Sequence, residues 1–352
     1  MSDWPAKDAT PSSRKVVPTS DGVPAGVRHE VPASPVSSLN WVLATARPST
    51  GGSRVGPVRR LSISHRPDAA LHDAGYEAPG QGANGATVLV RTLEKTMDHA
   101  PLISANELQR ISPLRLLYVP GGGERADGLA SVPIDDWIET AQRSQSGFDD
   151  LTFWHRELQA LGVGPDAMTV VLDDGRMTEA ARVWFILQYF GLPAAVLNGG
   201  LSALNQVPDQ LPPHSAPLKL RPGSGLVGLR DRLSLRDELE NVQVFDARSG
   251  AEYRGEDLKG NSRGGHLPGA INLSHDMFLD GQRLRDAREI ENMLDAAGLS
   301  RDRPIVSHCN GGGRAALAAL AAVIAGRSDV NVYYLSFADW AADESCEIST
   351  LR

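Results

Sequence analysis

The residues best suited to chemistry lie near the carboxyl end, in the run Ile305–Ala315, which reads IVSHCNGGGRA. Apolar residues lead into Cys309, three glycines and Arg314, and an Ala/Leu-rich stretch over 315–325 follows. This order predicts a buried strand, a tight loop and a helix. Glycines let successive backbone N–H groups point inward, and the start of a helix adds the positive end of its dipole. The loop therefore favours an anionic sulfur on Cys309.

The length of this loop separates two kinds of anion chemistry. Four residues stand between Cys309 and Arg314, so the loop is Cys-x4-Arg. Cysteine phosphatases use Cys-x5-Arg, a wider ring that encloses a tetrahedral phosphate. The shorter ring suits a persulfide, whose terminal sulfur is held by backbone N–H groups. The alternative is that Cys309 is a buried structural cysteine beside a glycine turn and has no catalytic role.

Three further motifs stand upstream in a fixed order. VFDARS occupies residues 244–249, EYRG residues 252–255 and GHLPGAINL residues 265–273. They resemble the Asp-x-Arg, Glu-Tyr-x-Gly and Gly-His-Ile-Pro-Gly-Ala-x-Asn signatures of the rhodanese (sulfurtransferase) family. With the Cys309 loop as the fourth signature, the chain is similar to this family over its whole carboxyl-terminal third.

The position of these motifs suggests which residues bind the substrate. The short apolar strand expected over 242–245 ends in charged residues, and open α/β sheets bind ligands at the carboxyl ends of their strands. Arg248 is therefore a candidate ligand for an anionic sulfur donor, as the resemblance also implies. Asp246 is expected to order the loop, and His266 to be structural. Cys309 is the candidate nucleophile, and the candidate substrate-binding residues are Arg248, Arg314, Asn310, Gly311, Gly312 and Gly313.

The first half of the chain repeats the second without the cysteine. Residues 169–182 align with residues 304–317 without a gap, and this alignment places Asp174 on Cys309 and Glu179 on Arg314. A carboxylate cannot carry a sulfane sulfur, so we expect the first copy to be catalytically silent. A repeat of this length indicates a duplicated domain. The arrangement resembles tandem-domain thiosulfate and 3-mercaptopyruvate sulfurtransferases, which implies an α/β fold with two rhodanese-like domains, each a mostly parallel sheet flanked by helices.

The composition along the chain suggests domain boundaries. Residues 1–98 are rich in Pro, Ser, Thr and Ala, and we expect a mostly disordered extension there. The folded part begins near Pro101, so the silent domain is placed at 99–205. Five prolines over 206–226 indicate an interdomain linker at 206–228, and the catalytic domain follows at 229–352.

Composition also excludes several classes of function. A net charge of −8 argues against nonspecific binding to nucleic acid. No His/Cys group has zinc spacing and no stretch approaches the ~20 apolar residues of a membrane span, so we expect no metal, no cofactor and no membrane partner. The two cysteines do not form a disulfide scaffold and fit a reducing, cytoplasmic location. Cys346, in a polar and acidic context, is interpreted as a bystander.

These observations predict a sulfurtransferase. Cys309 would take a sulfane sulfur from an anionic donor, thiosulfate or 3-mercaptopyruvate, and pass it as a persulfide to cyanide, a thiol or a thioredoxin-like protein. In the rhodanese family, basic residues after the cysteine go with thiosulfate and small polar residues with 3-mercaptopyruvate. The uncharged loop Asn310–Gly313 resembles the second type, which implies a slight preference for 3-mercaptopyruvate, whereas Arg314 departs from the pattern of both donor classes. The alternatives are a cysteine-dependent phosphatase or arsenate reductase, and a noncatalytic rhodanese-like regulatory module.

Overall fold

The computed structural model of the chain describes residues 100–121 and 126–350. The disordered extension expected over 1–98 lies outside these residues and stays a prediction. Within the described ranges, no helix is both long enough and apolar enough to serve as a membrane span.

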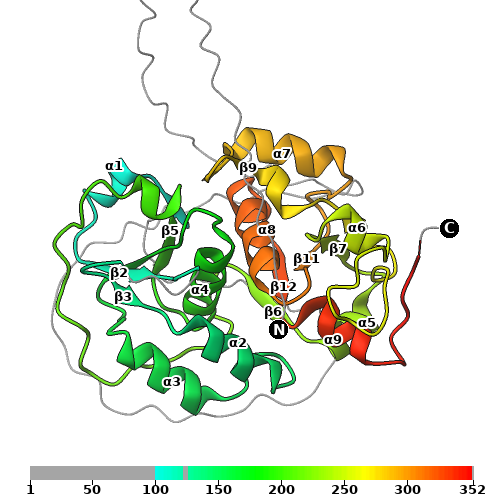
Figure 1. The fold of residues 1–352 in the computed structure, drawn as a ribbon, viewed down its shortest axis with the longest axis horizontal. Helices are drawn as coiled ribbons and strands as arrows, with labels where there is room; N and C mark the ends of the chain where they lie inside the picture. The colour runs from blue at the N-terminus through cyan, green and yellow to red at the C-terminus, as the bar shows by residue number, and fades with distance from the viewer. Residues whose placement is uncertain (1–99, 122–125, 351–352) are drawn as a thin grey trace, which may run out of the picture. The chain divides into compact units, whose positions relative to one another are not determined.

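The first half of the described chain forms a five-stranded sheet in the order β1-β5-β4-β2-β3, and every neighbouring pair is parallel (Figure 1). Parallel neighbours require crossover connections, which the helices between the strands supply. The elements are β1 Leu102–Ile103, α1 Ala105–Leu108, β2 Leu114–Tyr118, β3 Ala130–Ser131, α2 Ile134–Gln142, α3 Leu151–Ala160, β4 Met168–Leu172, α4 Thr178–Tyr189, β5 Ala194–Leu197 and the 3-10 helix η1 Gly200–Ala203.

The second half forms another five-stranded parallel sheet, in the order β6-β12-β11-β7-β8. A separate antiparallel pair, β9 and β10, lies between β8 and β11 in the sequence. The elements are β6 Gly228–Arg230, α5 Arg232–Glu238, β7 Gln243–Asp246, α6 Gly250–Tyr253, β8 Ile271–Asn272, η2 His275–Phe278, β9 Leu279–Asp280, β10 Arg283–Leu284, α7 Ala287–Ala296, β11 Ile305–His308, α8 Gly313–Ile324, β12 Val330–Tyr333 and α9 Ser336–Ala342.

The two sheets repeat one topology, as the internal repeat predicts. If the strands are matched in sequence order, their arrangement is identical in the two sheets. Helices α4 and α8 begin and end at equivalent positions of the ungapped alignment. Even the backbone before each helix matches, because Met177 and Gly312 occupy equivalent positions and have φ of 62° and 97°. The duplication therefore extends to the loop that carries Cys309 in the second copy.

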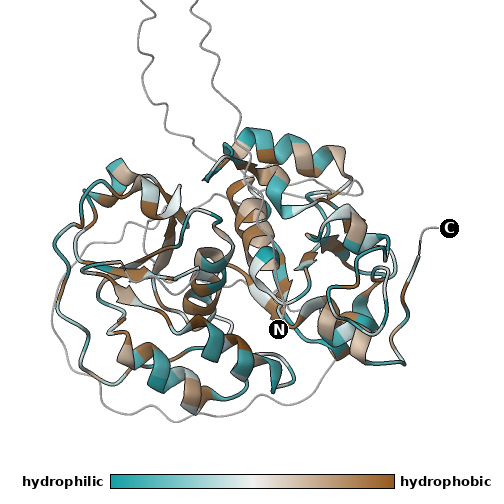
Figure 2. Cartoon of the chain, in the orientation of Figure 1, coloured by the Kyte–Doolittle hydropathy of each residue, from teal (hydrophilic) through white to brown (hydrophobic). Residues whose placement is uncertain are grey.

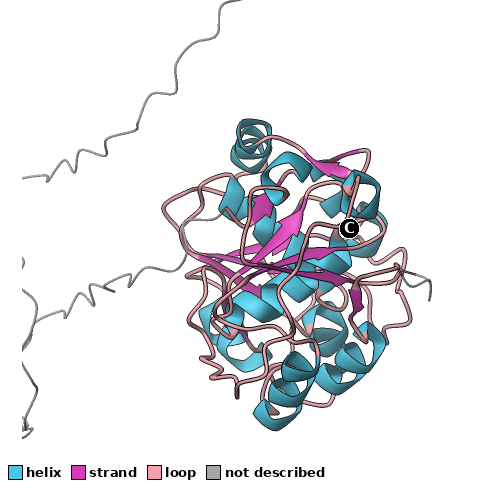
Figure 3. Cartoon of the chain, turned by 90° about the vertical axis from the view of Figure 1, so that its left-hand side faces the viewer, coloured by secondary structure: helices cyan, strands magenta, loops and turns pink. Residues whose placement is uncertain are grey.

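Both faces of the first sheet are buried, which explains the apolar strands. Along β2, the side chain of Leu117 belongs to one buried cluster, whereas Leu114 and Leu116 belong to the cluster on the opposite face. Figure 3 shows the strands lying between helices, as expected for parallel sheets. Figure 2 shows the difference between helices: α8 is mainly hydrophobic, while hydrophilic and hydrophobic residues alternate along α7.

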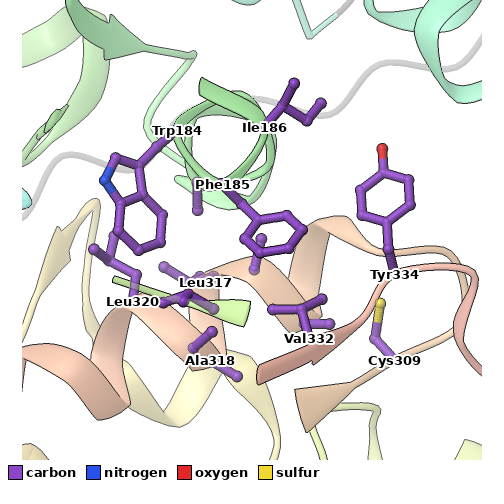
Figure 4. Close-up of a cluster of buried hydrophobic side chains, with 14 of the residues drawn as sticks. Trp184, Phe185, Ile186, Cys309, Leu317, Ala318, Leu320, Val332 and Tyr334 are labelled. Atoms are coloured by element: carbon purple, nitrogen blue, oxygen red, sulfur yellow. The ribbon is translucent and has the colours of Figure 1, made fainter. Parts of the chain in front are cut away.

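Helices α4 and α8, one from each half, pack against each other. Almost every residue of α8 is buried, and its many alanines let α4 approach closely. Figure 4 shows Trp184 and Phe185 of α4 facing Leu317 and Leu320 of α8. The two halves thus share one apolar core at this contact, and the Cys309 loop lies at the start of α8.

The segment 206–226 has neither helix nor strand. Its backbone makes hydrogen bonds to the first half, from Leu211 to Leu114, from His214 to Gly162 and from Arg221 to Phe190. These contacts fit a connection that runs along the first half before β6 begins. The domain limits 99–205, 206–228 and 229–352 remain proposals.

Candidate active site

The strand, loop and helix predicted around Cys309 are all present. Strand β11 is fully buried between β7 and β12, Cys309 follows its last residue, and α8 begins at Gly313. Gly312 has a φ of 97°, a left-handed conformation that strongly favours glycine. A Cβ at this position would lie 2.9 Å from the carbonyl oxygen of Tyr334 and 3.0 Å from its ring. The loop geometry therefore depends on this glycine.

The sulfur of Cys309 accepts a backbone hydrogen bond and lies near a hydroxyl. The backbone N–H of Gly312 donates to Sγ at 3.1 Å, and the hydroxyl of Ser336 lies 3.8 Å from it. Only 2% of Cys309 is exposed. Figure 4 shows it beside Tyr334, at the margin of the aromatic cluster between α4 and the second sheet. An N–H donor at the start of a buried helix is suited to stabilise negative charge on this sulfur.

Ser336 is a site residue that the sequence analysis missed. Its hydroxyl accepts the N–H of Cys309 at 3.1 Å and donates to the carbonyl of Tyr333 at 2.9 Å. Its φ of 63° is unusual for a residue with a side chain. Residues 196–201 align with 332–337 after a shift of one residue, which places Gly200, with φ of 60°, on Ser336. A strained serine in contact with the candidate nucleophile fixes the backbone at Cys309. A serine where the first copy has glycine was the available signal.

Arg314 is bound by a carboxylate at the mouth of the loop. Its Nη1 and Nη2 donate to the two carboxylate oxygens of Glu252 at 2.7 and 2.8 Å. Burial would lower the pKa of Arg314, but Glu252 and the nearby Cys309 sulfur raise it. Burial would raise the pKa of Glu252, but Arg314 and Ser249 lower it to about 2. Both groups are therefore charged at neutral pH, and Arg314 adds positive charge beside the sulfur.

This ion pair predicts a loss of stability in acid. The pKa of Glu252 is about 2 in the folded chain and 4.5 ordinarily, so its stabilisation is complete above pH 4.5 and is lost as the pH falls through 2. We expect Glu252→Gln to unfold more easily in urea than the unmodified chain, by about 1.5–3 kcal/mol at pH 7. The difference should shrink between pH 4.5 and 2.

Glu256→Gln is the matched control, because Glu256 pairs with Arg254 on the surface. It should leave the urea midpoint nearly unchanged at every pH. A difference between Glu252→Gln and the unmodified chain that stayed constant down to pH 2 would contradict the depressed pKa of Glu252.

The remaining predicted loop residues are brought together around the sulfur. Asn310 accepts a hydrogen bond from Asn261 at 2.7 Å through its side-chain oxygen. Gly311 has open space where a Cβ would stand, so the loop is accessible there. At Gly313 a Cβ would lie 2.7 Å from the carboxylate of Glu179, a residue of the first half. The loop is thus open on one side and tightly covered on the other.

The structure does not present Arg248 to a donor. Its side chain is 2% exposed and its guanidinium donates to Asp246 at distances down to 2.6 Å and to the carbonyl of Gly265 at 2.8 Å. The guanidinium carbon also lies 3.9 Å from the centre of the Phe337 ring. A buried guanidinium whose Nε and Nη2 already donate to Asp246 and Gly265 is poorly placed to bind a donor, which speaks against the substrate-binding role expected from the sequence. That role stays a prediction.

Two histidines near the site have structural surroundings. His308 is buried, its Nδ1 lies 3.2 Å from the carbonyl of Cys309, and burial lowers its pKa. His266 stacks on Tyr253 with ring centroids 3.8 Å apart, and its Nδ1 is 3.0 Å from the Tyr253 carbonyl. The neutral, buried imidazole of His308 and the stacked imidazole of His266 both order the backbone beside them. For His266 this is the structural role expected from the sequence.

Cys346, interpreted from the sequence as a bystander, is a buried thiol. It is 1% exposed despite its polar neighbours. Burial and the charge of Asp343 raise its pKa. A thiol that is less acidic than usual and inaccessible is a poor nucleophile.

In the first half, the residues equivalent to Cys309 and Arg314 make ion pairs of their own. Asp174 pairs with Arg176 at 2.8 Å, and its carbonyl accepts a hydrogen bond from Gln282 of the second half. Glu179 pairs with Arg182 at 2.6 Å. No thiol stands at this place, and the acids are already neutralised by neighbouring arginines.

Comparison with known proteins identifies a domain family and several sulfurtransferases as relatives of this chain. The rhodanese-like domain family matches residues 230–343. A thiosulfate sulfurtransferase of Azotobacter vinelandii is 34% identical over 187 residues, which cover 51% of this chain and 69% of that protein. A 3-mercaptopyruvate sulfurtransferase of Mus musculus is 30% identical over 255 residues, which cover 65% of this chain and 85% of that protein.

A solved structure extends the likeness to the fold. SseA from Escherichia coli, described with the rhodanese fold of 3-mercaptopyruvate sulfotransferases, has a TM-score of 0.55 and 20% identity. The superposition covers 68% of this chain and 100% of the other. The predicted fold of two tandem rhodanese-like domains is confirmed. With its sequence relatives, its topology and its Cys309 loop taken together, this chain belongs to the rhodanese family.

Proposed function

We propose that the chain is a sulfurtransferase that moves a sulfane sulfur from thiosulfate or 3-mercaptopyruvate, through a persulfide on Cys309, to cyanide or a thiol. The observation that carries the proposal is the 3.1 Å hydrogen bond from the Gly312 N–H to the Cys309 sulfur, at the start of α8 in a Cys-x4-Arg loop. A thiolate needs this kind of stabilisation, and a persulfide places its negative charge one atom further along the same loop.

In the first step the Cys309 thiolate attacks the outer sulfur of the donor. With thiosulfate, the S–S bond breaks and sulfite leaves with the electron pair. With 3-mercaptopyruvate, the C–S bond breaks and the pyruvate carbanion takes up a proton. Either donor leaves Cys309 as a persulfide, a covalent intermediate that gives ping-pong kinetics.

In the second step an acceptor removes the sulfur. Cyanide attacks the terminal sulfur, thiocyanate is released and the Cys309 thiolate is restored. A small thiol or a reduced thioredoxin-like protein can act in the same way.

Arg314 is the cation that we expect to meet an anionic donor. Its side chain is 22% exposed, and its charge interacts with the Cys309 sulfur. Glu252 holds the guanidinium in place, so an anionic donor meets a fixed positive charge beside the loop. The backbone N–H groups of Asn310, Gly311, Gly312 and Gly313 complete the binding surface.

The proposal assigns different tasks to the two halves. Residues 229–352 carry the chemistry, residues 206–228 connect, and residues 99–205 form a catalytically silent domain because Asp174 replaces the nucleophile. Both cysteines are free thiols, which fits a reducing compartment such as the cytoplasm. The acceptor there would be a thiol rather than cyanide.

The decisive experiment is steady-state sulfur transfer to cyanide, measured as thiocyanate, with each donor in turn. We expect saturable turnover with at least one donor, and mass spectrometry should find one added sulfur atom on the peptide that contains Cys309. Absence of both signals would refute the proposal. Hydrolysis of a phosphate ester without sulfur gain would favour the phosphatase alternative.

A further inference from the structure

An arginine of the catalytically silent half reaches the loop of the other half. Arg182, on α4, donates through Nη1 to the carbonyl oxygen of Gly311 at 2.7 Å and to the hydroxyl of Tyr334 at 3.0 Å. Its Nε donates to Glu179 at 2.6 Å. The side chain is only 7% exposed. A buried guanidinium shared among a carboxylate, a hydroxyl and a carbonyl of the Cys309 loop has a single fixed position.

The contacted carbonyl belongs to the peptide unit that holds the sulfur. The carbonyl of Gly311 and the N–H of Gly312 are two ends of one planar amide, and in a trans amide they point in opposite directions. Arg182 binds the carbonyl end, and the Cys309 sulfur accepts the N–H end at 3.1 Å. A charged donor on the carbonyl fixes the plane of this amide and polarises its N–H, which strengthens the bond to the sulfur.

The surroundings keep this amide from turning. Tyr334 packs its ring against Gly312, where a Cβ would lie 3.0 Å from the ring. The Arg182 guanidinium carbon lies 5.5 Å from the centre of the same ring. On the other side, Glu179 and Arg182 leave no room for a Cβ at Gly313. The loop is therefore clamped between Tyr334 of its own half and two residues of α4.

The second half has no arginine at the position equivalent to Arg182. The residue equivalent to Arg182 in the second half is Leu317, which is buried in the apolar contact between α4 and α8. Arg182 is a charge on the mainly apolar, buried part of α4. Burying a cation at a helix contact is unfavourable unless its partners repay the loss of hydration. The Glu179 carboxylate supplies that compensation, and the guanidinium also donates to the carbonyl of Gly311 in the loop.

We propose that Arg182 is a positioning residue for Cys309: the silent half orients the Gly311–Gly312 amide and thereby stabilises the anionic sulfur. The proposal rests on the proposed function for the role of Cys309, and it adds a task for the first domain. Arg182 touches neither donor nor sulfur and acts through the amide alone. Loss of Arg182 should therefore change the protonation and persulfide chemistry of Cys309 more than donor binding.

The test compares Arg182→Gln with the unmodified chain and with Arg115→Gln. Arg115 is a matched control, since it also lies in the first half, is partly buried and donates to a backbone carbonyl, that of Leu161 at 3.0 Å. The first readout is the pH dependence of iodoacetamide alkylation of Cys309, followed by peptide mass spectrometry. The second is kcat and KM for sulfur transfer to cyanide.

In Arg182→Gln we expect the alkylation midpoint to move to higher pH by about half to one unit, because the thiolate loses part of its stabilisation. We expect kcat to fall roughly 10- to 100-fold, less than for complete removal of such a donor, with a smaller change in donor KM. Arg182→Lys should recover part of both effects. Arg115→Gln should match the unmodified chain in both readouts.

A second variant covers the case in which Arg182→Gln does not fold because Glu179 is left unpaired. Glu179→Gln/Arg182→Gln removes both charges and should show the same shift of the alkylation midpoint. An unchanged midpoint and kcat in a folded Arg182 variant, or an equal change in Arg115→Gln, would overturn the proposal. Alkylation needs no sulfur donor, so a shifted midpoint without any persulfide would refute the proposed function and leave this inference standing.

Discussion

Cys309→Ser should abolish sulfur transfer and leave the fold intact. A serine hydroxyl accepts the Gly312 N–H as the thiol does, so the loop keeps its hydrogen bond. It is far less acidic than a thiol and cannot form a persulfide, and we expect turnover to fall roughly 10⁴-fold or more, the scale seen when a covalent nucleophile is removed. Thiocyanate formation and the mass of the Cys309 peptide measure the two consequences.

Cys346→Ser is the control for general effects of removing a thiol. Cys346 is buried, and a hydroxyl without a partner there should cost about 1–3 kcal/mol of stability. Its turnover should nevertheless stay close to that of the unmodified chain. Substantial activity in purified Cys309→Ser, or added sulfur on Cys346, would show that the nucleophile is misassigned.

The sequence predicted the elements whose signals are local. The strand, loop and helix around Cys309 follow from an apolar run, three glycines and an alanine-rich stretch, all within about twenty residues of chain. The internal repeat predicted the same strand, loop and helix in the first half, where α4 begins and ends at positions equivalent to those of α8. The parallel topology was implied by the resemblance to the rhodanese family, and both sheets have it.

Arg248 shows what a motif cannot tell about the orientation of a side chain. Its position after a strand suggested a free cation at the sheet edge. Its orientation depends on Asp246, two residues earlier, and on Gly265 and Phe337, which are distant in sequence. An arginine that forms an ion pair within its own motif has the same sequence pattern as one that binds a ligand.

Arg182 and Glu252 were missed for a related reason. Arg182 entered the sequence analysis only as part of the repeat, although a charge among buried apolar residues requires a specific partner. Glu252 was noted as part of a motif, but nothing local relates it to Arg314, which follows it at a distance of 62 residues. Such pairs are visible only when the fold brings their elements together.

Arg248→Ala should reduce stability severely rather than weaken donor binding. The side chain of Asp246 is fully buried, and its carboxylate accepts three hydrogen bonds from the Arg248 guanidinium. Removing the arginine leaves this charge unpaired, with His308 at 3.5 Å as its nearest remaining cationic candidate. Burial lowers the pKa of His308, so that imidazole is neutral at pH 7 and offers no compensating charge. We expect the free energy of unfolding to fall by about 3–5 kcal/mol, measured in urea.

Two further variants separate the structural role of Arg248 from a role in binding. Arg248→Lys keeps a charge but cannot contact both carboxylate oxygens and the Gly265 carbonyl together, so it should recover only part of the stability. Asp246→Asn/Arg248→Met removes both charges and should be more stable than Arg248→Ala, because no carboxylate remains unpaired. In each variant that folds, the KM for thiosulfate and for 3-mercaptopyruvate should stay near its original value. An Arg248→Ala protein with an unchanged urea midpoint and a clearly raised KM would instead establish Arg248 as a donor ligand, and its buried pair with Asp246 would then have to open during binding.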